Sequence, residues 1–149
     1  MSVRIDFYIL PDLDSDARQR FACRLAHKAL THGHRVHVHT PDPDAAAELD
    51  ALMWRYPPLQ FLPHARQAAA HDAEATASAP VVISHEPPVT PADMLINLSQ
   101  AVPGFFSQFD RVAEIVIASE KAVMRENYRF YRNKGYALYH HELDQWEEQ

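Results

Sequence analysis

The sequence predicts one α/β domain with a Rossmann-like, mostly parallel central sheet and helices on both faces. The first 55 residues read as strand, helix, strand, helix, an opening that predicts parallel strands joined by crossovers. Several later segments are short, apolar and bounded by proline or glycine, as buried strands are. A length of 149 residues suits one domain, so residues 1–149 are expected to form a single unit.

The first strand and helix have clear ends. Residues 3–10 become a continuous apolar run, which is typical of a buried strand, and Pro11 ends it. Asp14 or Ser15 can then cap a helix that has an apolar stripe along one side. Gly33 is placed to end that helix at about residue 32.

The next pair follows the same scheme. Residues 35–40 alternate between polar and apolar side chains and predict a second strand. Asp42 or Asp44 can cap a helix that continues to Arg55, before the Pro57-Pro58 pair breaks it.

The second half is predicted to add the remaining strands. Residues 59–62 fit a short strand or an extended loop, and the segment 64–80 fits a frayed helix or a loop. Residues 104–109 are expected to form a helical turn. Further strands are predicted at residues 80–84, 94–98, 112–118 and 136–139.

The C-terminal region is predicted to hold one more helix and a loose end. Ser119 can cap a helix that ends at Lys134, where Gly135 supplies the C-terminal cap. The acidic residues 142–149 are expected to be loose apart from Trp146.

Composition limits the class of function. The net charge of −6 argues against autonomous binding of nucleic acid, which needs a basic surface. Cys23 is the only cysteine, so no internal disulfide can form, and it fits a buried structural thiol better than a nucleophile. With no secretory signal or membrane-length apolar run, a cytoplasmic protein is expected.

The residues that bind nucleotides in such folds are missing. The three glycines are far apart, so no phosphate-binding glycine motif can be written, and no cofactor is expected. His37 and His39 share one face of a strand, but they lack the spacing of a zinc site, so no metal site is expected. A small metal- or nucleotide-dependent enzyme using His37, His39 and Asp6 remains the alternative.

Two segments carry binding chemistry instead of catalytic chemistry. In the last helix, Lys121, Arg125, Arg129 and Arg132 recur every three or four residues and form one basic stripe, accompanied by Tyr128. This pattern fits either a solvated charged face or a groove for an acidic segment with an aromatic anchor, since arginine binds carboxylates in pairs. Direct binding of single-stranded DNA, with bases stacked on tyrosine, is a further alternative that the net charge disfavours.

The second segment runs from residue 53 to residue 64 and combines prolines with apolar side chains. The aromatic side chains of Trp54, Tyr56 and Phe61 crowd into it. Such residues on a loop form either a lid over the core or an exposed hot spot for a partner.

At these segments and others the chain resembles the chi subunit of bacterial DNA polymerase III. The resemblance spans nearly the whole chain, and its separate motifs are weak alone but fairly specific in series. They are Asp6-Phe-Tyr-Ile-Leu10, Met53-Trp54, Phe61-Leu-Pro-His64, Met94-Leu-Ile-Asn-Leu98 and the stretch from Arg125 to Tyr136. The junction at Ala118 and Ser119 departs from the family in being shorter.

The resemblance implies a non-catalytic adaptor that joins two partners in DNA replication. One partner is the psi subunit of the clamp-loader assembly, and Trp54, Phe61 and Pro63 match the region that faces it. The other is the acidic C-terminal tail of single-stranded-DNA-binding protein, which ends in an aromatic residue. The residues that match the tail-binding region are Val116, Lys121, Arg125, Tyr128, Gly135 and Tyr136.

Overall fold

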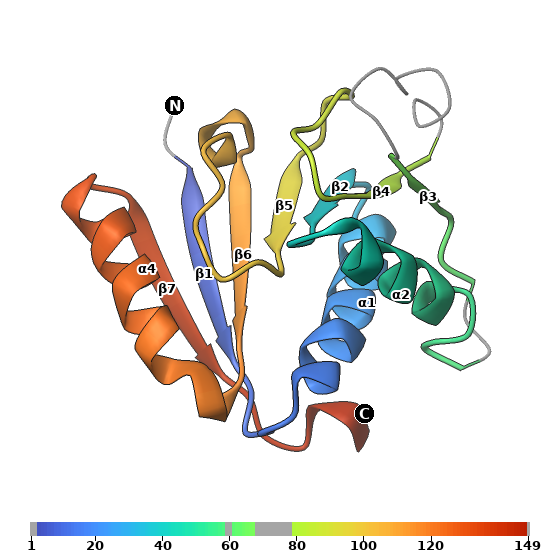
Figure 1. Cartoon of the computed structure of the whole chain (residues 1–149). Helices are drawn as coiled ribbons and strands as arrows, with labels where there is room; N and C mark the ends of the chain where they lie inside the picture. The colour runs from blue at the N-terminus through green and yellow to red at the C-terminus, as the bar shows by residue number, and fades with distance from the viewer. Residues whose placement is uncertain (1–2, 59–60, 68–78, 149) are drawn as a thin grey trace.

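The computed structural model describes residues 3–58, 61–67 and 79–148 and contains one sheet of seven strands (Figure 1). The strand order is β3-β4-β2-β5-β6-β1-β7, and every neighbouring pair is parallel. The strands are β1 (Arg4–Ile9), β2 (Val36–His39), β3 (His64–Arg66), β4 (Val81–Ser84), β5 (Met94–Asn97), β6 (Arg111–Val116) and β7 (Ala137–Glu142). The predicted Rossmann-like class is confirmed.

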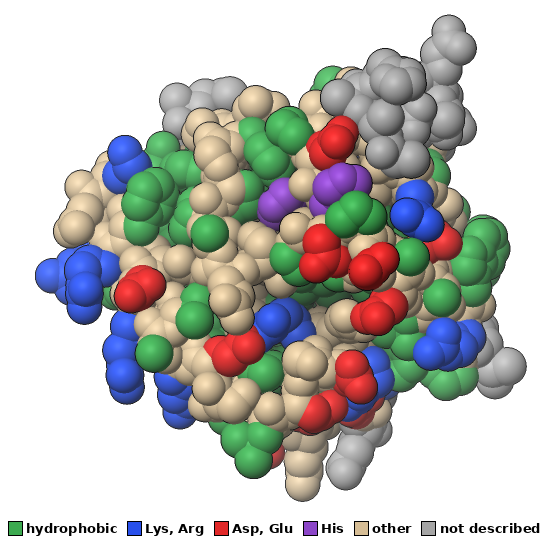
Figure 2. All heavy atoms as spheres, viewed as in Figure 1, with side chains coloured by type: hydrophobic (Ala, Val, Ile, Leu, Met, Phe, Trp, Pro, Cys, Tyr) green, Lys and Arg blue, Asp and Glu red, His purple; other side chains and the backbone are tan. Residues whose placement is uncertain are grey.

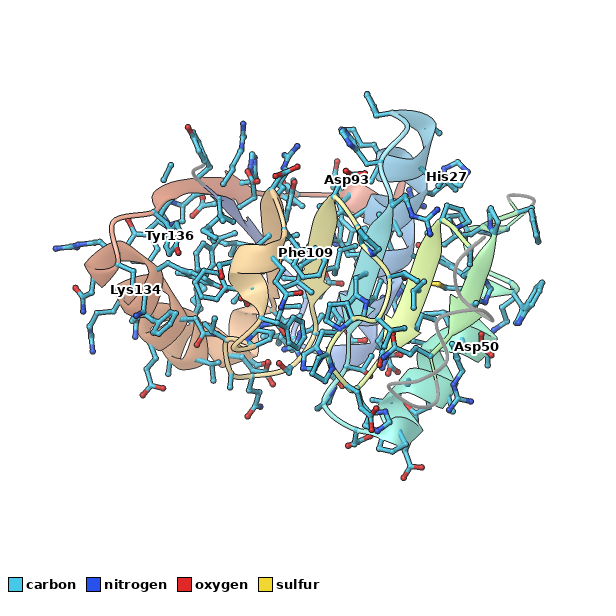
Figure 3. The ribbon with its side chains drawn as sticks, turned by 90° about the horizontal axis from the view of Figure 1, so that it is seen from above. His27, Asp50, Asp93, Phe109, Lys134 and Tyr136 are labelled. Carbon is cyan, nitrogen blue, oxygen red and sulfur yellow. The ribbon has the colours of Figure 1, made fainter. Side chains whose placement is uncertain are left out.

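Helices cover both faces of the sheet. α1 (Ser15–Thr31) and α2 (Pro43–Met53) pack on one apolar cluster, which includes Val38 and Ile83. α4 (Lys121–Asn133) packs on a second cluster around Phe7 and Tyr131. Seen from above in Figure 3, α1 and α4 lie on opposite sides of the strands between them. Three 3-10 turns, Phe106–Gln108, Ala118–Glu120 and Trp146–Glu148, complete the described structure.

Most predicted boundaries agree with the structure. The Asp42 side chain accepts a hydrogen bond from the Ala45 backbone N–H at 2.8 Å and caps α2 as predicted. Gly33 and Gly135 follow α1 and α4 with φ of +80° and +85°, a conformation that favours glycine. The predicted turn at 104–109 contains the 3-10 turn Phe106–Gln108.

Two predictions about individual elements are wrong. Within segment 64–80 the structure forms the strand β3, which neither predicted alternative contained; residues 68–78 lie outside the described residues, as do residues 59 and 60. Ser119 does not cap the last helix: its Oγ donates to the Leu13 carbonyl at 2.9 Å, and a 3-10 turn precedes α4. The chain is held at this junction by the segment after β1, so α4 begins later.

The acidic end is not loose as far as residue 147. The Trp146 indole N–H donates to Asp12 at 2.9 Å, and its ring meets Phe21 edge-on with 5.3 Å between centroids. The Glu147 carboxylate accepts hydrogen bonds from Arg20 at 2.8 Å and from the Tyr56 hydroxyl at 2.7 Å. Arg20 on α1 thus neutralises the Glu147 carboxylate.

Across the described ranges, no helix combines the length and the apolar character that a membrane crossing requires.

Candidate functional site

The basic stripe lies on the outer side of α4, where Figure 2 shows Lys and Arg side chains gathered along one edge of the molecule. Lys121, Arg125, Arg129 and Arg132 are all exposed. At 100° per residue, Tyr128 shares one side of the helix with three of these cations. We call this side, made of Lys121, Arg125, Tyr128 and Arg132, the α4 surface.

Tyr128 is the half-buried member of the α4 surface. Its ring stacks on His140 of β7 with 5.0 Å between centroids and lies 5.7 Å from Phe7 of β1. The sequence analysis missed His140, because the last strand was predicted to end at residue 139 and the pairing of His140 with Phe7 follows only from the register of the sheet. Since β7 is the outermost strand, the α4 surface adjoins an open sheet edge.

The turn after α4 carries the other predicted residues on this side. Gly135 is exposed, and Tyr136 is half-buried with its ring edge-on to Phe106 at 5.3 Å. The Tyr136 N–H donates to the Tyr131 carbonyl at 3.2 Å, which fixes the turn against the helix end. Gly135 and Tyr136 therefore follow the α4 surface directly.

Val116 lies apart from the cations. It is 7% exposed and lines a pocket of about 20 Å³ under the first turns of α4, together with Val123 and Met124. Lys121, Arg125 and Tyr128 do not line this pocket. It has room for about one water molecule, whereas a benzene ring needs a cavity on the order of 150 Å³.

A buried polar network anchors α4 beside that pocket. Glu114 of β6 accepts hydrogen bonds from the Tyr131 hydroxyl at 2.6 Å and from Asn97 Nδ2 at 3.0 Å. Burial raises the pKa of Glu114 to about 7, although these two hydrogen bonds and the charge of Arg18 oppose the shift. The sequence analysis missed Glu114, although a lone carboxylate inside an apolar strand was the signal.

The Trp54 patch, which we define as Trp54, Phe61 and Pro63, lies at the other end of the sheet. Trp54 follows α2 and is 64% exposed, and Phe61 precedes β3 and is 69% exposed. Their ring centroids are 6.2 Å apart, and Pro63 is half-buried. Neither aromatic ring forms a lid over the core. Of the two alternatives that the sequence left open, a lid or an exposed surface, the structure shows an exposed surface.

The residues of the enzyme alternative do not come together. His37 of β2 is buried against Phe105 and Phe109, and burial together with His39 lowers its pKa to about 4. Asp6 lies on β1, with β5 and β6 between it and β2, and points to the other face of the sheet. Within the described part of the chain, no three His, Cys, Asp or Glu side chains are placed to hold a metal ion.

Asp6 and Cys23 have structural roles instead. Burial would raise the pKa of Asp6, but hydrogen bonds from His141, Arg4 and Arg111 lower it below its ordinary value. Burial raises the pKa of the Cys23 thiol to about 12, so it is a structural side chain as predicted.

Comparison with known proteins agrees with the resemblance seen in the sequence. Residues 1–139 match the family model described as DNA polymerase III chi subunit, HolC. The chain is 41% identical over 143 residues to the DNA polymerase III subunit chi of Pseudomonas aeruginosa, covering 94% of this chain and 96% of that protein. The subunits chi of Haemophilus influenzae and Escherichia coli are 29% and 27% identical, covering 93% and 89% of this chain and 96% and 92% of those proteins. The chain belongs to the DNA polymerase III chi subunit family and has an accessory role in DNA replication.

Proposed function

We propose that this chain is a non-catalytic, single-domain adaptor that binds two proteins at opposite ends of its sheet. The Trp54 patch binds the psi subunit, and the α4 surface binds the acidic C-terminal tail of single-stranded-DNA-binding protein. The observation that carries the second assignment is an exposed row of cations beside a half-buried tyrosine, on a chain whose net charge is −6. Such a row suits a short acidic peptide, whose carboxylates arginine binds through paired hydrogen bonds.

The geometry also suggests where the terminal aromatic ring of the tail lies. The pocket beneath α4 is too small for a phenyl ring unless Val123 and Met124 move. Tyr128 and Tyr136 are both half-buried; Tyr128 lies on the helix that carries the cations, and Tyr136 lies in the turn directly after it. We therefore assign the aromatic anchor to the Tyr128–Tyr136 side and give Val116 the role of supporting the first turns of α4.

Charge reversal tests the tail assignment. Lys121→Glu with Arg125→Glu should weaken binding of a short acidic peptide ending in Pro-Phe at least tenfold, because a hydrogen bond to a charged group contributes ~1.5–3 kcal/mol. Calorimetric titration measures this, beside a peptide that lacks the terminal Phe. Arg66→Glu, an exposed arginine on β3, is the matched control and should leave the affinity unchanged. Unchanged affinity in the double variant would remove the α4 surface from the proposal.

The adaptor proposal also predicts simultaneous binding. The Trp54 patch lies beside β3, and the α4 surface lies beside β7, at the two ends of a seven-stranded sheet. Six strand spacings of ~4.8 Å put the two ends roughly 29 Å apart, so the two ligands should not touch. The affinity for psi should change less than twofold when the tail peptide is saturating. Mutual exclusion in that titration would show that one surface has been assigned wrongly.

A further inference from the structure

A groove of about 780 Å³ runs between α1 and the part of the sheet formed by β1 and β6. It opens on the side of the sheet where Figure 3 labels Asp93, away from α4. Neither the family assignment nor the proposed partners account for it. Its lining residues include the cations Arg4, Arg24, Lys28 and Arg111 and the carboxylates of Asp93, Asp110 and Asp144.

The sheet wall of the groove carries two arginines that one buried carboxylate holds in place. Asp6 is 0% exposed and accepts hydrogen bonds from Nε of Arg4 at 3.2 Å and Nε of Arg111 at 2.9 Å. His141 adds a third contact to Asp6 at 2.8 Å. One carboxylate therefore neutralises only one of the two guanidinium groups, whose side chains are 45% and 41% exposed. Arginines fixed in this way lose little freedom on binding an anion.

The helix wall supplies an apolar floor with a basic rim. Phe21, Leu25 and Ala29 recur every four residues and form one row along α1. Lys28 precedes Ala29, lines the same groove and is exposed. Arg24 precedes Leu25 and already donates to the Tyr56 hydroxyl at 2.9 Å and to the Glu147 carbonyl at 3.0 Å. The lining residues of α1 run from Phe21 to Ala29, which at 1.5 Å per residue is about 12 Å, the length of roughly four residues of extended peptide.

Aromatic rings make one end of the groove apolar. Tyr8 packs against Phe21 and stacks on His141, with centroid distances of 5.3 and 4.7 Å. Trp146 closes the row against Phe21 at 5.3 Å. This end suits an apolar side chain of a ligand, while Arg4, Arg111 and Lys28 suit its carboxylates.

We propose that this groove, between α1 and the β1–β6 face, is a docking site for an extended acidic peptide segment of a partner protein, with apolar side chains between its carboxylates. Nucleic acid fits less well, because its phosphates recur at every nucleotide and cannot avoid the carboxylates at the groove ends. Asp93 and Asp110 lie before β5 and β6, and Asp144 lies beyond β7, so these acids lie at opposite ends of the parallel strands. A peptide can place its own charges between them.

Selection from a random decapeptide phage library tests this site without a guess at the partner. The bait is the full chain with Lys121→Glu and Arg125→Glu, which suppresses the α4 surface and keeps the result independent of the proposed function. We expect enrichment of sequences in which acidic and apolar residues alternate. Adding Lys28→Glu to the bait should lower its affinity for the selected peptide at least fivefold, as measured by fluorescence titration. Lys28 is exposed, so its replacement leaves the fold intact.

Two further variants complete the design. Arg111→Gln should also weaken the peptide, whereas the control Arg66→Glu, far from the groove on β3, should not. Enrichment of basic or neutral peptides, or affinity that Lys28→Glu leaves unchanged, would overturn the proposal. Displacement of the peptide by a ten-residue oligothymidylate at equal concentration would also overturn it, in favour of a nucleic-acid site.

Discussion

Replacing Trp54 and Phe61 together by alanine should abolish measurable binding of the psi subunit and leave the fold unchanged. Both rings are mostly exposed, at 64% and 69%, so they contribute little to folding and are free to be buried by a partner. Truncating a buried interface aromatic costs roughly 2 kcal/mol or more, so the loss of both should weaken binding on the order of a thousandfold. Surface plasmon resonance with immobilised psi measures the change.

The single variants and one control make that result specific. Each single alanine variant should weaken binding roughly thirtyfold, which corresponds to about 2 kcal/mol. A double-mutant cycle measures any coupling between the two rings, which are 6.2 Å apart. Leu13→Ala is the matched control, since Leu13 is an exposed apolar residue, 71% exposed, in a different part of the chain. The patch would not be the psi site if the double variant bound within threefold of the parent while Leu13→Ala bound as the parent does.

The βαβα opening could be predicted because its signals are local. Proline, glycine and aspartate mark the ends of elements, and the apolar period distinguishes helix from strand. The strand β3 was not predictable in this way. β3 has only three residues, His64–Arg66, and is defined by its pairing with β4, a contact between segments distant in sequence. Strand pairing of this kind overrides the weak local preference.

The candidate sites also divide into features that one short segment encodes and contacts between distant segments. The cations of the α4 stripe and the aromatic residues of the Trp54 patch could be recognised because each set lies within one short segment. The sequence left open whether Trp54 and Phe61 are exposed, and only the structure shows that they are. The partners that complete the α4 surface come from elsewhere: His140 from β7 stacks on Tyr128, and Phe7 from β1 lies behind it. The pairing of the acidic end with Arg20 also joins the two ends of the chain, which no local pattern encodes.

The buried Glu114 should give the protein an unusual pH dependence. Its pKa is raised from 4.5 to about 7, so the folded state binds this proton more tightly than the unfolded state does. By proton linkage, its contribution to the free energy of unfolding is most favourable below pH 4.5 and declines as the pH rises towards 7. The decline is on the order of 3 kcal/mol, since each pKa unit corresponds to about 1.4 kcal/mol.

Urea unfolding of the parent and of Glu114→Gln at pH 5, 6, 7 and 8 measures this contribution. Glutamine does not titrate, so the stability of Glu114→Gln relative to the parent should rise by about 3 kcal/mol between pH 5 and pH 8. Glu126→Gln removes an exposed carboxylate on α4, is the control and should show no such trend.

Tyr131→Phe removes the hydroxyl that donates to the Glu114 carboxylate at 2.6 Å, so it should raise the pKa of Glu114 further and shift the decline in stability to higher pH. If the difference in the free energy of unfolding between the parent and Glu114→Gln stays constant from pH 5 to pH 8, Glu114 is not the titrating group. The α4 helix depends on the same hydroxyl contact, so weaker tail binding by Tyr131→Phe would link this buried network to the α4 surface.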